Sequence, residues 1–471
     1  MMIPPATSED LVLGTVDTND PRDRSIPVRL TPEQQGYHTA VWGMSGLGKS
    51  VLLRIVFLML LRQGKTVGLI DPAGDLSQSV LHTLVAKGYF RTPDAYKQLV
   101  YIDFANGAIT PLNVLSGTTA PHSTALHLLD AMTRVWPELH DAPAFTELFV
   151  SSVMVLMANA LPLTALSRLL TDDGFRKECL TSGVVLDPNV QATFAMYDKL
   201  GRDQAQTAGS TLRRAFQLSF SPLLRQMLEQ PDNVLRFRAF ADAGVSYILN
   251  LGGVTEQHTR RLITALSMVQ IEQAFLSRVD LDPSLRRECV LLIDEWISVA
   301  GQAQTLGNLL DQLRKYGLRL WLAGQSIGAV NSDRLTAALE NCKTVISFGL
   351  GRESAEIQAR QLATFDPYVV KEPTYAAGSH SLYFSIQEQL EGWTNAIQHL
   401  PKGICFVKVH NQPPIRTRVL NAPEDTPDPA ELQEVLDTYR QMYQRVPQRL
   451  DVPSEDEDES RTRAYQRLFR T

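Results

Sequence analysis

The stretch that decides the fold reads His38-Thr39-Ala40-Val41-Trp42-Gly43-Met44-Ser45-Gly46-Leu47-Gly48-Lys49-Ser50. Its first part, Thr39 to Trp42, has the apolar character of a buried strand, and its last eight residues fit the pattern G-x-x-x-x-G-K-[ST]. From Lys49 to Arg62, apolar residues lie all around a predicted helix, which indicates packing on several sides. A strand, a glycine-rich turn and a buried helix in this order provide the structural context of a phosphate-binding loop.

The residue types in this turn suit a nucleotide. Glycines permit a tight backbone whose N–H groups point at phosphates, and the following helix adds the positive end of its dipole. Lys49 would neutralise the outer phosphates, and Ser50 would ligate Mg²⁺. We therefore expect ATP and Mg²⁺ to bind here. The expected ATP-binding residues are Gly43, Ser45, Gly46, Leu47, Gly48, Lys49, Ser50 and Val51.

A second apolar strand, Val290 to Ile293, ends in the acidic pair Asp294-Glu295. At the carboxyl edge of a parallel sheet, the two acids can take different tasks. Asp294 would hold the hydration shell of Mg²⁺, and Glu295 would orient and polarise the water that attacks the terminal phosphate. The pair therefore predicts a hydrolase rather than a protein that only binds nucleotide. The alternative is a surface strand end with ordinary acids.

Two further polar positions follow predicted strands. Gln325 follows the apolar run Leu320 to Gly324, and its side chain would either contact the terminal phosphate or the attacking water, or cap the next helix. Asp71 to Asp75 ends the strand predicted from Thr66, and its acids either lie near the site or form a strand-ending turn. The sequence leaves both pairs of alternatives open.

Short apolar runs bounded by turn residues predict an α/β fold with a mostly parallel sheet. Besides 39–42, these runs are 66–70, 99–102, 245–249, 290–293, 318–323, 344–348 and 404–409. Between Leu115 and Phe240 the pattern changes to helical periodicity, which predicts an inserted all-helical domain. We expect a lead-in over 1–29, a core in two parts over 30–115 and 241–420, an insertion over 116–240 and an acidic tail over 421–471.

The composition is that of a folded protein. The 471 residues are 44% hydrophobic and 20% charged, and the four cysteines have no metal-ligand spacing. Leu148 to Ser167 is uncharged and about as long as a membrane span, but Pro162 divides it, which predicts two core helices instead. The N-terminus shows no export signal, so we expect a cytoplasmic protein without a transmembrane segment.

The net charge of −6 lies mostly at the C-terminal end. From Ala422 to Thr471 there are twelve acidic residues and seven arginines, so the body is nearly neutral and is compatible with a basic channel for nucleic acid. Within this tail, Asp428 can cap a helix that carries Pro429 at its first position. The helix would be amphipathic and would offer a surface to a protein partner.

Several of these segments together resemble the HerA/FtsK superfamily of pumping ATPases. The resemblance rests on the phosphate-binding loop with the strand before it, the turn Asp71 to Leu76, and Thr110 to Leu115. Two later segments look like the TraG-type and HerA-type DNA-transfer branch. They are Arg314-Lys315-Tyr316-Gly317-Leu318, which leads to Gln325, and Asn341 through Phe348 to Ala355.

The resemblance implies a RecA-like P-loop core that assembles into a homohexameric ring and hydrolyses ATP to drive DNA through a central pore. The setting would be conjugation, mobile-element transfer or DNA processing, with helicase activity left open. Many relatives place an arginine directly after the phenylalanine that corresponds to Phe348, where this chain has Gly349. Arg352 is then the nearest candidate for an arginine that acts in trans, or it is simply solvated. The expected catalytic residues are Lys49, Glu295, Gln325 and Arg352.

Two other functions are compatible with the same residues. One is a secretion-system ATPase that energises protein export, for which the sequence holds no marker. The other is an ATP-controlled ring scaffold that docks an effector such as a nuclease through the C-terminal tail. A small-molecule kinase fits less well, because Glu295 is suited to activating water and no second substrate motif is visible.

Overall fold

The computed structural model describes residues 9–20, 23–104, 107–116, 120–139, 142–182, 187–200, 209–297, 310, 312–327, 339, 341–372 and 382–447. The chain divides into two compact units. The first comprises Met1–Tyr101, Ala239–Asn250 and Phe275–Gln433, and the second comprises Ile102–Arg238, Leu251–Ala274 and Glu434–Thr471. The second unit thus takes in more of the chain than the insertion expected over 116–240.

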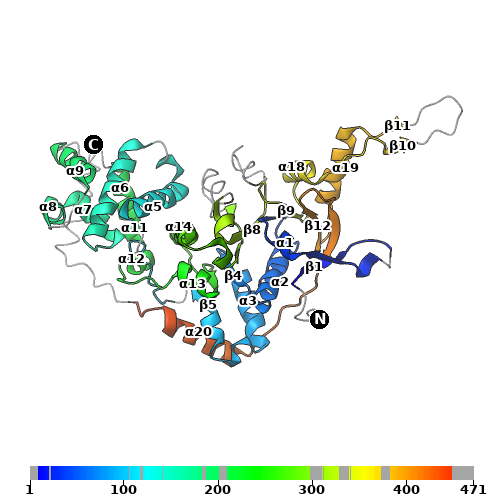
Figure 1. Ribbon diagram of the computed structural model, residues 1–471, viewed down its shortest axis with the longest axis horizontal. Coiled ribbons are helices and arrows are strands. Elements are labelled where there is room, and N and C mark those ends of the chain that lie inside the picture. Colours follow the sequence, from blue (N-terminus) through cyan, green and yellow to red (C-terminus); the bar gives the residue numbers. More distant parts are fainter. Residues whose placement is uncertain are drawn as a thin grey trace. The chain divides into compact units, whose positions relative to one another are not determined.

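A large mixed sheet is the centre of the first unit (Figure 1). In the described residues its spatial order is β2 (Pro27–Leu30), β1 (Leu11–Val16), β13 (Ile415–Val419), β12 (Ile404–Val409), β9 (Thr344–Ser347), β3 (Thr39–Trp42), β8 (Leu318–Gly324), β7 (Cys289–Ile293), β4 (Thr66–Asp71), β6 (Ser246–Asn250) and β5 (Leu99–Asp103). The pairs of β3 with β8 and β9, of β7 with β8 and β4, and of β4 with β6 are parallel. The predicted mostly parallel sheet is confirmed, and each predicted apolar run coincides with a strand.

An antiparallel edge completes the sheet. β12 pairs antiparallel with β9 and with β13, and β1 pairs antiparallel with β13 and β2. Two strands of this edge, β1 and β2, begin within residues 1–29, the expected lead-in. These strands are short and bury alternate residues such as Val28 and Leu30 beside the exposed Arg29. Alternation over so few residues gives a weak signal in a sequence.

Helices of the first unit include α2 (Lys49–Arg62), α3 (Asp75–Ala86), α18 (Arg352–Leu362) and α19 (Ile386–Gln398), with the short α1 (Pro32–Gln35) and α4 (Ala95–Gln98). α2 has the predicted bounds, and it contacts β1, β4 and α3. A small hairpin of β10 (Val370–Glu372) and β11 (Leu382–Tyr383) lies beside α19 (Figure 1). α2 starts directly after the glycine-rich loop, so its amino end faces whatever that loop binds.

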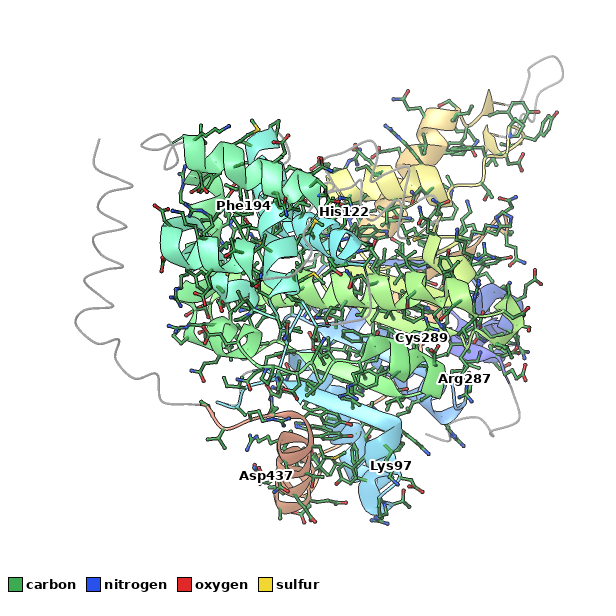
Figure 2. The ribbon with its side chains drawn as sticks, turned by 60° about the vertical axis from the view of Figure 1, so that its left-hand side comes forward. Lys97, His122, Phe194, Arg287, Cys289 and Asp437 are labelled. Carbon is green, nitrogen blue, oxygen red and sulfur yellow. The ribbon has the colours of Figure 1, made fainter. Side chains whose placement is uncertain are left out.

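The described part of the second unit is largely helical. Its helices are α5 (Pro121–Val135), α6 (Pro143–Ala158), α7 (Leu166–Thr171), α8 (Asp173–Thr181), α9 (Pro188–Lys199), α11 (Gly209–Phe220) and α12 (Pro222–Leu228), while α13 (Phe237–Ala243), α14 (Gln257–Leu276) and α20 (Pro429–Tyr443) cross its borders. Phe194 on α9 is fully buried among them (Figure 2). The uncharged stretch from Leu148 is divided between α6 and α7, as predicted. In the described ranges no helix is both long and apolar enough to cross a bilayer.

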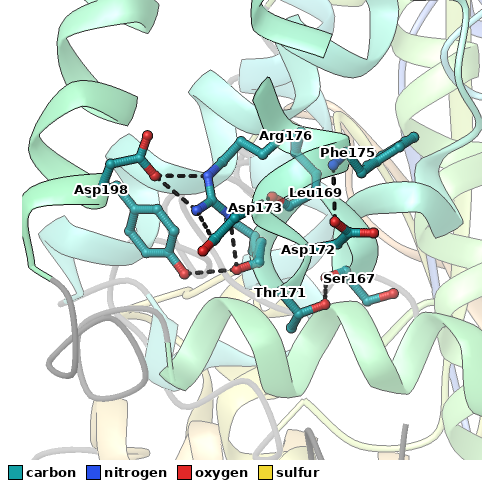
Figure 3. A network of polar contacts seen from close by, with 10 residues as sticks. Ser167, Leu169, Thr171, Asp172, Asp173, Phe175, Arg176 and Asp198 are labelled. Carbon is teal, nitrogen blue, oxygen red and sulfur yellow. Dashed lines mark hydrogen bonds and ion pairs between the residues drawn. The ribbon is translucent and has the colours of Figure 1, made fainter. Parts of the chain in front are cut away.

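A buried arginine joins three of these helices (Figure 3). Arg176 on α8 is 1% exposed, and its Nε donates to Asp198 Oδ1 on α9 at 2.9 Å. Its Nη1 donates to the carbonyl of Leu169 on α7 at 3.2 Å. A buried guanidinium is tolerated when its charge and its donors are satisfied in this way. The network therefore serves the packing of α7, α8 and α9.

The described part of the predicted tail is folded onto the chain. Asp428 caps α20 with its carboxylate, as predicted. In the first unit, the buried guanidinium of Arg54 on α2 donates to the carbonyl of Ala422. In the second unit, the N–H of Arg445 donates to the carbonyl of Ile109 at 2.7 Å. Residues 421–447 are thus part of the fold, whereas the acidic run 455–459 lies outside the described residues.

Candidate active site

The loop between β3 and α2 has a backbone that demands glycine. Gly46 and Gly48 have φ angles of +78° and +119°, which other residues rarely adopt. Gly43 is required for a different reason, because a Cβ there would lie 2.6 Å from the Cβ of Phe348. The N–H of Gly43 donates to the carbonyl of Gly324 at 3.1 Å. This bond anchors the start of the loop to the end of β8.

The amino end of α2 closes the loop. The N–H of Leu52 donates to the carbonyl of Gly48 at 3.0 Å, which is the first hydrogen bond of the helix. The amides of Lys49, Ser50 and Val51 precede it and have no acceptor one turn back within the helix. With the positive end of the helix dipole, they form an anion site of the kind that binds phosphate. Ser50 is exposed at the second position of α2.

Lys49 lies inside the loop and is only 5% exposed. Its Nζ donates to the carbonyl oxygens of Gly43 at 2.6 Å and of Met44 at 3.2 Å. Burial lowers the pKa of the Lys49 ammonium, and the nearby carboxylates of Asp294 and Glu295 oppose that shift. The lysine of the loop and the acidic pair, 245 positions apart in the sequence, thus act on each other electrostatically.

Asp294 follows β7 and is 6% exposed. Its N–H donates to the carbonyl of Ile70 at 3.1 Å, which continues the ladder to β4. Burial, followed by the carboxylates of Asp71 and Glu295, raises the pKa of Asp294 to about 6. The nearby Lys49 offsets the charge of these carboxylates only in part, and a hard divalent cation would balance the rest. The donor set therefore fits Mg²⁺, which Asp294 and Ser50 would hold.

The sequence left open whether Asp71 lies near the site or forms a strand-ending turn, and in the structure it does both. It is fully buried at the end of β4, and its carboxylate accepts hydrogen bonds from the N–H groups of Ala73 at 3.1 Å and Ser77 at 2.7 Å. It therefore fixes the turn into α3. Its charge also contributes to the raised pKa of Asp294, so it is a neighbour of the acidic pair as well.

Glu295 has a strained backbone. Its φ of +48° lies in the left-handed region, which costs a residue other than glycine on the order of 1 kcal/mol. Its N–H donates to Asp294 Oδ1 at 3.0 Å. Its Oε1 accepts a hydrogen bond from Nε2 of Gln325, just after β8, at 2.5 Å. The structure thus brings Gln325 against the carboxylate that the sequence assigns to water activation.

Arg352 has its partners on its own chain. At the start of α18, its Nε donates to Glu356 at 2.6 Å, and its Nη1 and Nη2 donate to Glu391 on α19 at 2.6 Å each. These bonds, first those to Glu391, raise the pKa of Arg352. The guanidinium therefore links α18 to α19, and its side chain is about half exposed, at 49%.

Gly349, which stands where many relatives have arginine, packs against the phosphate-binding loop. A Cβ at this position would lie 2.8 Å from Cδ1 of Leu47. The carbonyl of Gly349 accepts a hydrogen bond from the N–H of Met44 at 2.9 Å. A side chain at this position would therefore make Leu47 move aside and would lie close to the carbonyl oxygen of Leu400, at 3.2 Å.

Nothing in the sequence indicates the part that His38 plays. It is 1% exposed, and its Nδ1 accepts from the N–H of Leu320 at 2.9 Å, so Nε2 carries the proton and donates to the carbonyl of Leu310 at 2.8 Å. Burial lowers its pKa to about 4. The neutral ring thus links the residue before β3 to β8, and no neighbour in the sequence signals this role.

Comparison with solved structures reveals related folds. The plasmid coupling protein TrwB in complex with ADP and Mg²⁺ matches with a TM-score of 0.60 at 15% identity, over 91% of this chain and 99% of that chain. VirB4 of Thermoanaerobacter pseudethanolicus matches with a TM-score of 0.53 at 15% identity, over 90% of this chain and 98% of that chain. No family model and no curated protein sequence matches. The chain therefore has the RecA-like P-loop fold of the conjugative coupling protein TrwB and of VirB4, which is the fold that the resemblance to the HerA/FtsK superfamily predicted.

Proposed function

We propose that this chain is an ATPase that uses hydrolysis to move DNA and that works as a homohexameric ring. One observation supports the ATP hydrolysis in this proposal. Lys49 follows β3, the Asp294-Glu295 pair follows β7 and Gln325 follows β8, and these three strands are neighbours in the parallel part of the sheet. Their carboxyl ends share one edge of the sheet, where open α/β folds bind ligands.

Each residue has a task that its surroundings support. The amides at the start of α2 and the ammonium of Lys49 would bind the phosphates of ATP. Asp294 and Ser50 would hold Mg²⁺, which supplies positive charge next to the terminal phosphate. Glu295 would accept the proton of the attacking water.

Gln325 would link phosphate binding to this last step. In the structure the side-chain amide of Gln325 donates a hydrogen bond to Oε1 of Glu295. A terminal phosphate bound beside Gln325 would compete for the same N–H donor, because a phosphate oxygen is a strong charged acceptor. Bound ATP would then weaken the hydrogen bond that orients Glu295 and would change how its carboxylate meets the water.

We assign Arg352 a structural role instead of a role in trans. To reach the nucleotide of another subunit, its guanidinium would have to leave the hydrogen bonds to Glu356 and Glu391. Charge-assisted hydrogen bonds to two carboxylates already satisfy it.

The ring and the DNA substrate rest on the family resemblance, so they need a direct test. Steady-state ATP hydrolysis would be measured without DNA, with duplex DNA and with single-stranded DNA at low salt, for the native chain and for Glu295→Gln. Light scattering would report the size of the assembly. The proposal expects hydrolysis that DNA stimulates, that Glu295→Gln abolishes, and that occurs on a particle of six chains.

Hydrolysis that neither form of DNA changes would contradict the DNA motor and favour a protein-export ATPase. The scaffold hypothesis requires a truncation that leaves the fold intact. Removal of everything after Leu420 would take away the Ala422 carbonyl that accepts from Arg54 and the N–H of Arg445 that donates to Ile109, so the truncation should begin after Pro447 instead. Loss of partner binding with intact ATP hydrolysis would favour the scaffold.

A further inference from the structure

Two tryptophans meet across the strand that lies between them. Trp42 ends β3, and Trp296 directly follows Glu295 after β7. Their ring centroids are 6.0 Å apart at an interplanar angle of 67°. β8 lies between β3 and β7 in the sheet, so the two backbones are two strand spacings apart, about 10 Å. Only large side chains can meet over that distance, and only where the middle strand leaves room.

Gly324 leaves that room. It pairs with Trp42 in the register of β3 and β8. A Cβ on Gly324 would lie 3.0 Å from Cζ3 of Trp42 and 3.2 Å from Nε1 of Trp296. The φ angle of Gly324 is not positive, so its backbone conformation does not require glycine. Glycine is needed here because the two rings lie over it.

The same point of β8 is bound to both halves of the candidate site. The N–H of Trp296 donates to the carbonyl of Ala323 at 3.0 Å, and the N–H of Gly43 donates to the carbonyl of Gly324 at 3.1 Å. On its other side, Glu295 is flanked by Asp294, whose N–H is bonded to β4. Backbone hydrogen bonds of the residues before and after Glu295 therefore hold its strained backbone in place. A left-handed conformation outside glycine persists only where its surroundings determine it in this way.

We infer that Trp296 is a positioning residue for the reaction. Packed on Trp42 over Gly324, its ring holds the peptide after Glu295 in place, and this keeps the carboxylate directed at Gln325. It also ties that carboxylate to the residue that enters the phosphate-binding loop. Trp296 itself is 1% exposed and is not available to ATP or water. The inference rests on the proposed ATP hydrolysis, because it concerns the group that activates water.

The test compares Trp296→Ala with Trp296→Phe. Loss of the ring should let the turn relax, so kcat for ATP hydrolysis should fall by on the order of tenfold to a hundredfold, as expected for a misplaced catalytic group. KM and the affinity for a non-hydrolysable ATP analogue should stay within about threefold, since Lys49 and the loop are retained. Trp296→Phe keeps an aromatic ring and should recover most of kcat. In the described part of the chain, Nε1 of Trp296 has no hydrogen-bond partner that phenylalanine would lose.

Matched controls separate positioning from general packing. Trp136→Ala removes an equally large ring that is 5% exposed in the second unit, and it should leave kcat per folded molecule unchanged. If Trp296→Ala does not fold, Gly324→Ala decides, because its methyl group would displace the ring pair without removing either ring. Gly351→Ala, where a Cβ meets nothing within 4 Å, is its control.

A selective fall of kcat in Trp296→Ala and Gly324→Ala, with recovery in Trp296→Phe, supports the inference. Native kcat in both Trp296→Ala and Gly324→Ala overturns the inference but leaves the proposed ATPase standing. A fall of kcat and of analogue affinity by the same factor has the same meaning. A native chain that does not hydrolyse ATP overturns both.

Discussion

Nε2 of Gln325 donates a hydrogen bond to Oε1 of Glu295 at 2.5 Å, so the amide that follows β8 holds the carboxylate that follows β7. The bond takes up one lone-pair site of the carboxylate and fixes the direction of its Oε1 atom. Neighbouring strands make the contact, although Glu295 and Gln325 are 30 positions apart in the sequence. The site therefore contains a built-in restraint on the group that would activate water.

Replacement of Glu295 by glutamine should abolish turnover and leave nucleotide binding intact. The amide cannot accept the proton of water, so kcat should fall by at least about a hundredfold. Phosphate release would measure kcat, and calorimetry with a non-hydrolysable ATP analogue would measure binding. Glu288→Gln is the control, because Glu288 lies at the opposite end of β7, where it pairs with Arg319. A Glu295→Gln variant that turns over at the native rate would remove Glu295 from the mechanism.

Replacement of Lys49 by alanine should remove nucleotide binding without harming the nucleotide-free fold. Burial lowers the pKa of this ammonium, so its presence costs free energy until phosphates arrive. Thermal unfolding with and without Mg²⁺ and ATP would measure the loss of nucleotide binding. Mg²⁺ and ATP should raise the Tm of the native chain and of the surface control Lys87→Ala, but not the Tm of Lys49→Ala. An equal shift in Lys49→Ala would show that the nucleotide binds elsewhere.

Replacement of Arg352 by alanine should change little. Ion pairs between solvent-exposed side chains contribute little to stability, so the Tm should drop slightly and kcat should stay native. Arg360→Ala, an exposed arginine of the same helix, is the matched control. If Arg352→Ala is inactive alone but regains activity when mixed with Glu295→Gln chains, Arg352 acts in trans, and our structural assignment is wrong.

The parallel core could be predicted because its strands are buried on both faces. Such strands appear as continuous apolar runs, as in Val290 to Ile293, and the glycine-lysine motif then places the loop and α2. Of the antiparallel edge, the sequence predicts β12 but not β1, β2 and β13, for the opposite reason. In β13, Arg416 and Arg418 are exposed and alternate with the buried Thr417 and Val419, a polar pattern that a sequence does not distinguish from a loop.

The contacts within the site depend on strand order, which residue spacing does not disclose. Nothing between Trp42 and Trp296 indicates that β8 separates their strands or that Gly324 lets their rings meet. The prolines and acids of the C-terminal stretch are typical of a tail, and they conceal how closely the predicted helix packs on the fold. In the structure Val435 and Tyr439 of α20 are nevertheless buried.

His38 should make the free energy of unfolding depend on pH. Burial, with smaller contributions from Arg319 and Arg314, lowers its pKa from the ordinary 6.5 to about 4, although the hydrogen bond to Leu310 opposes the shift. Between these two pH values the unfolded chain binds a proton that the folded chain does not. Stability is therefore fully present above pH 6.5 and falls with the pH, by up to roughly 3 kcal/mol at pH 4.

Urea unfolding at several pH values between 4 and 7 would measure this slope. His38→Gln keeps one donor and one acceptor but does not titrate, so its free energy of unfolding should change less with pH than that of the native chain. His410→Gln, which removes an exposed histidine, is the control. Equal slopes in the native chain and in His38→Gln would mean that the ring enters the folded state protonated, which the N–H of Leu320 pointing at Nδ1 does not allow.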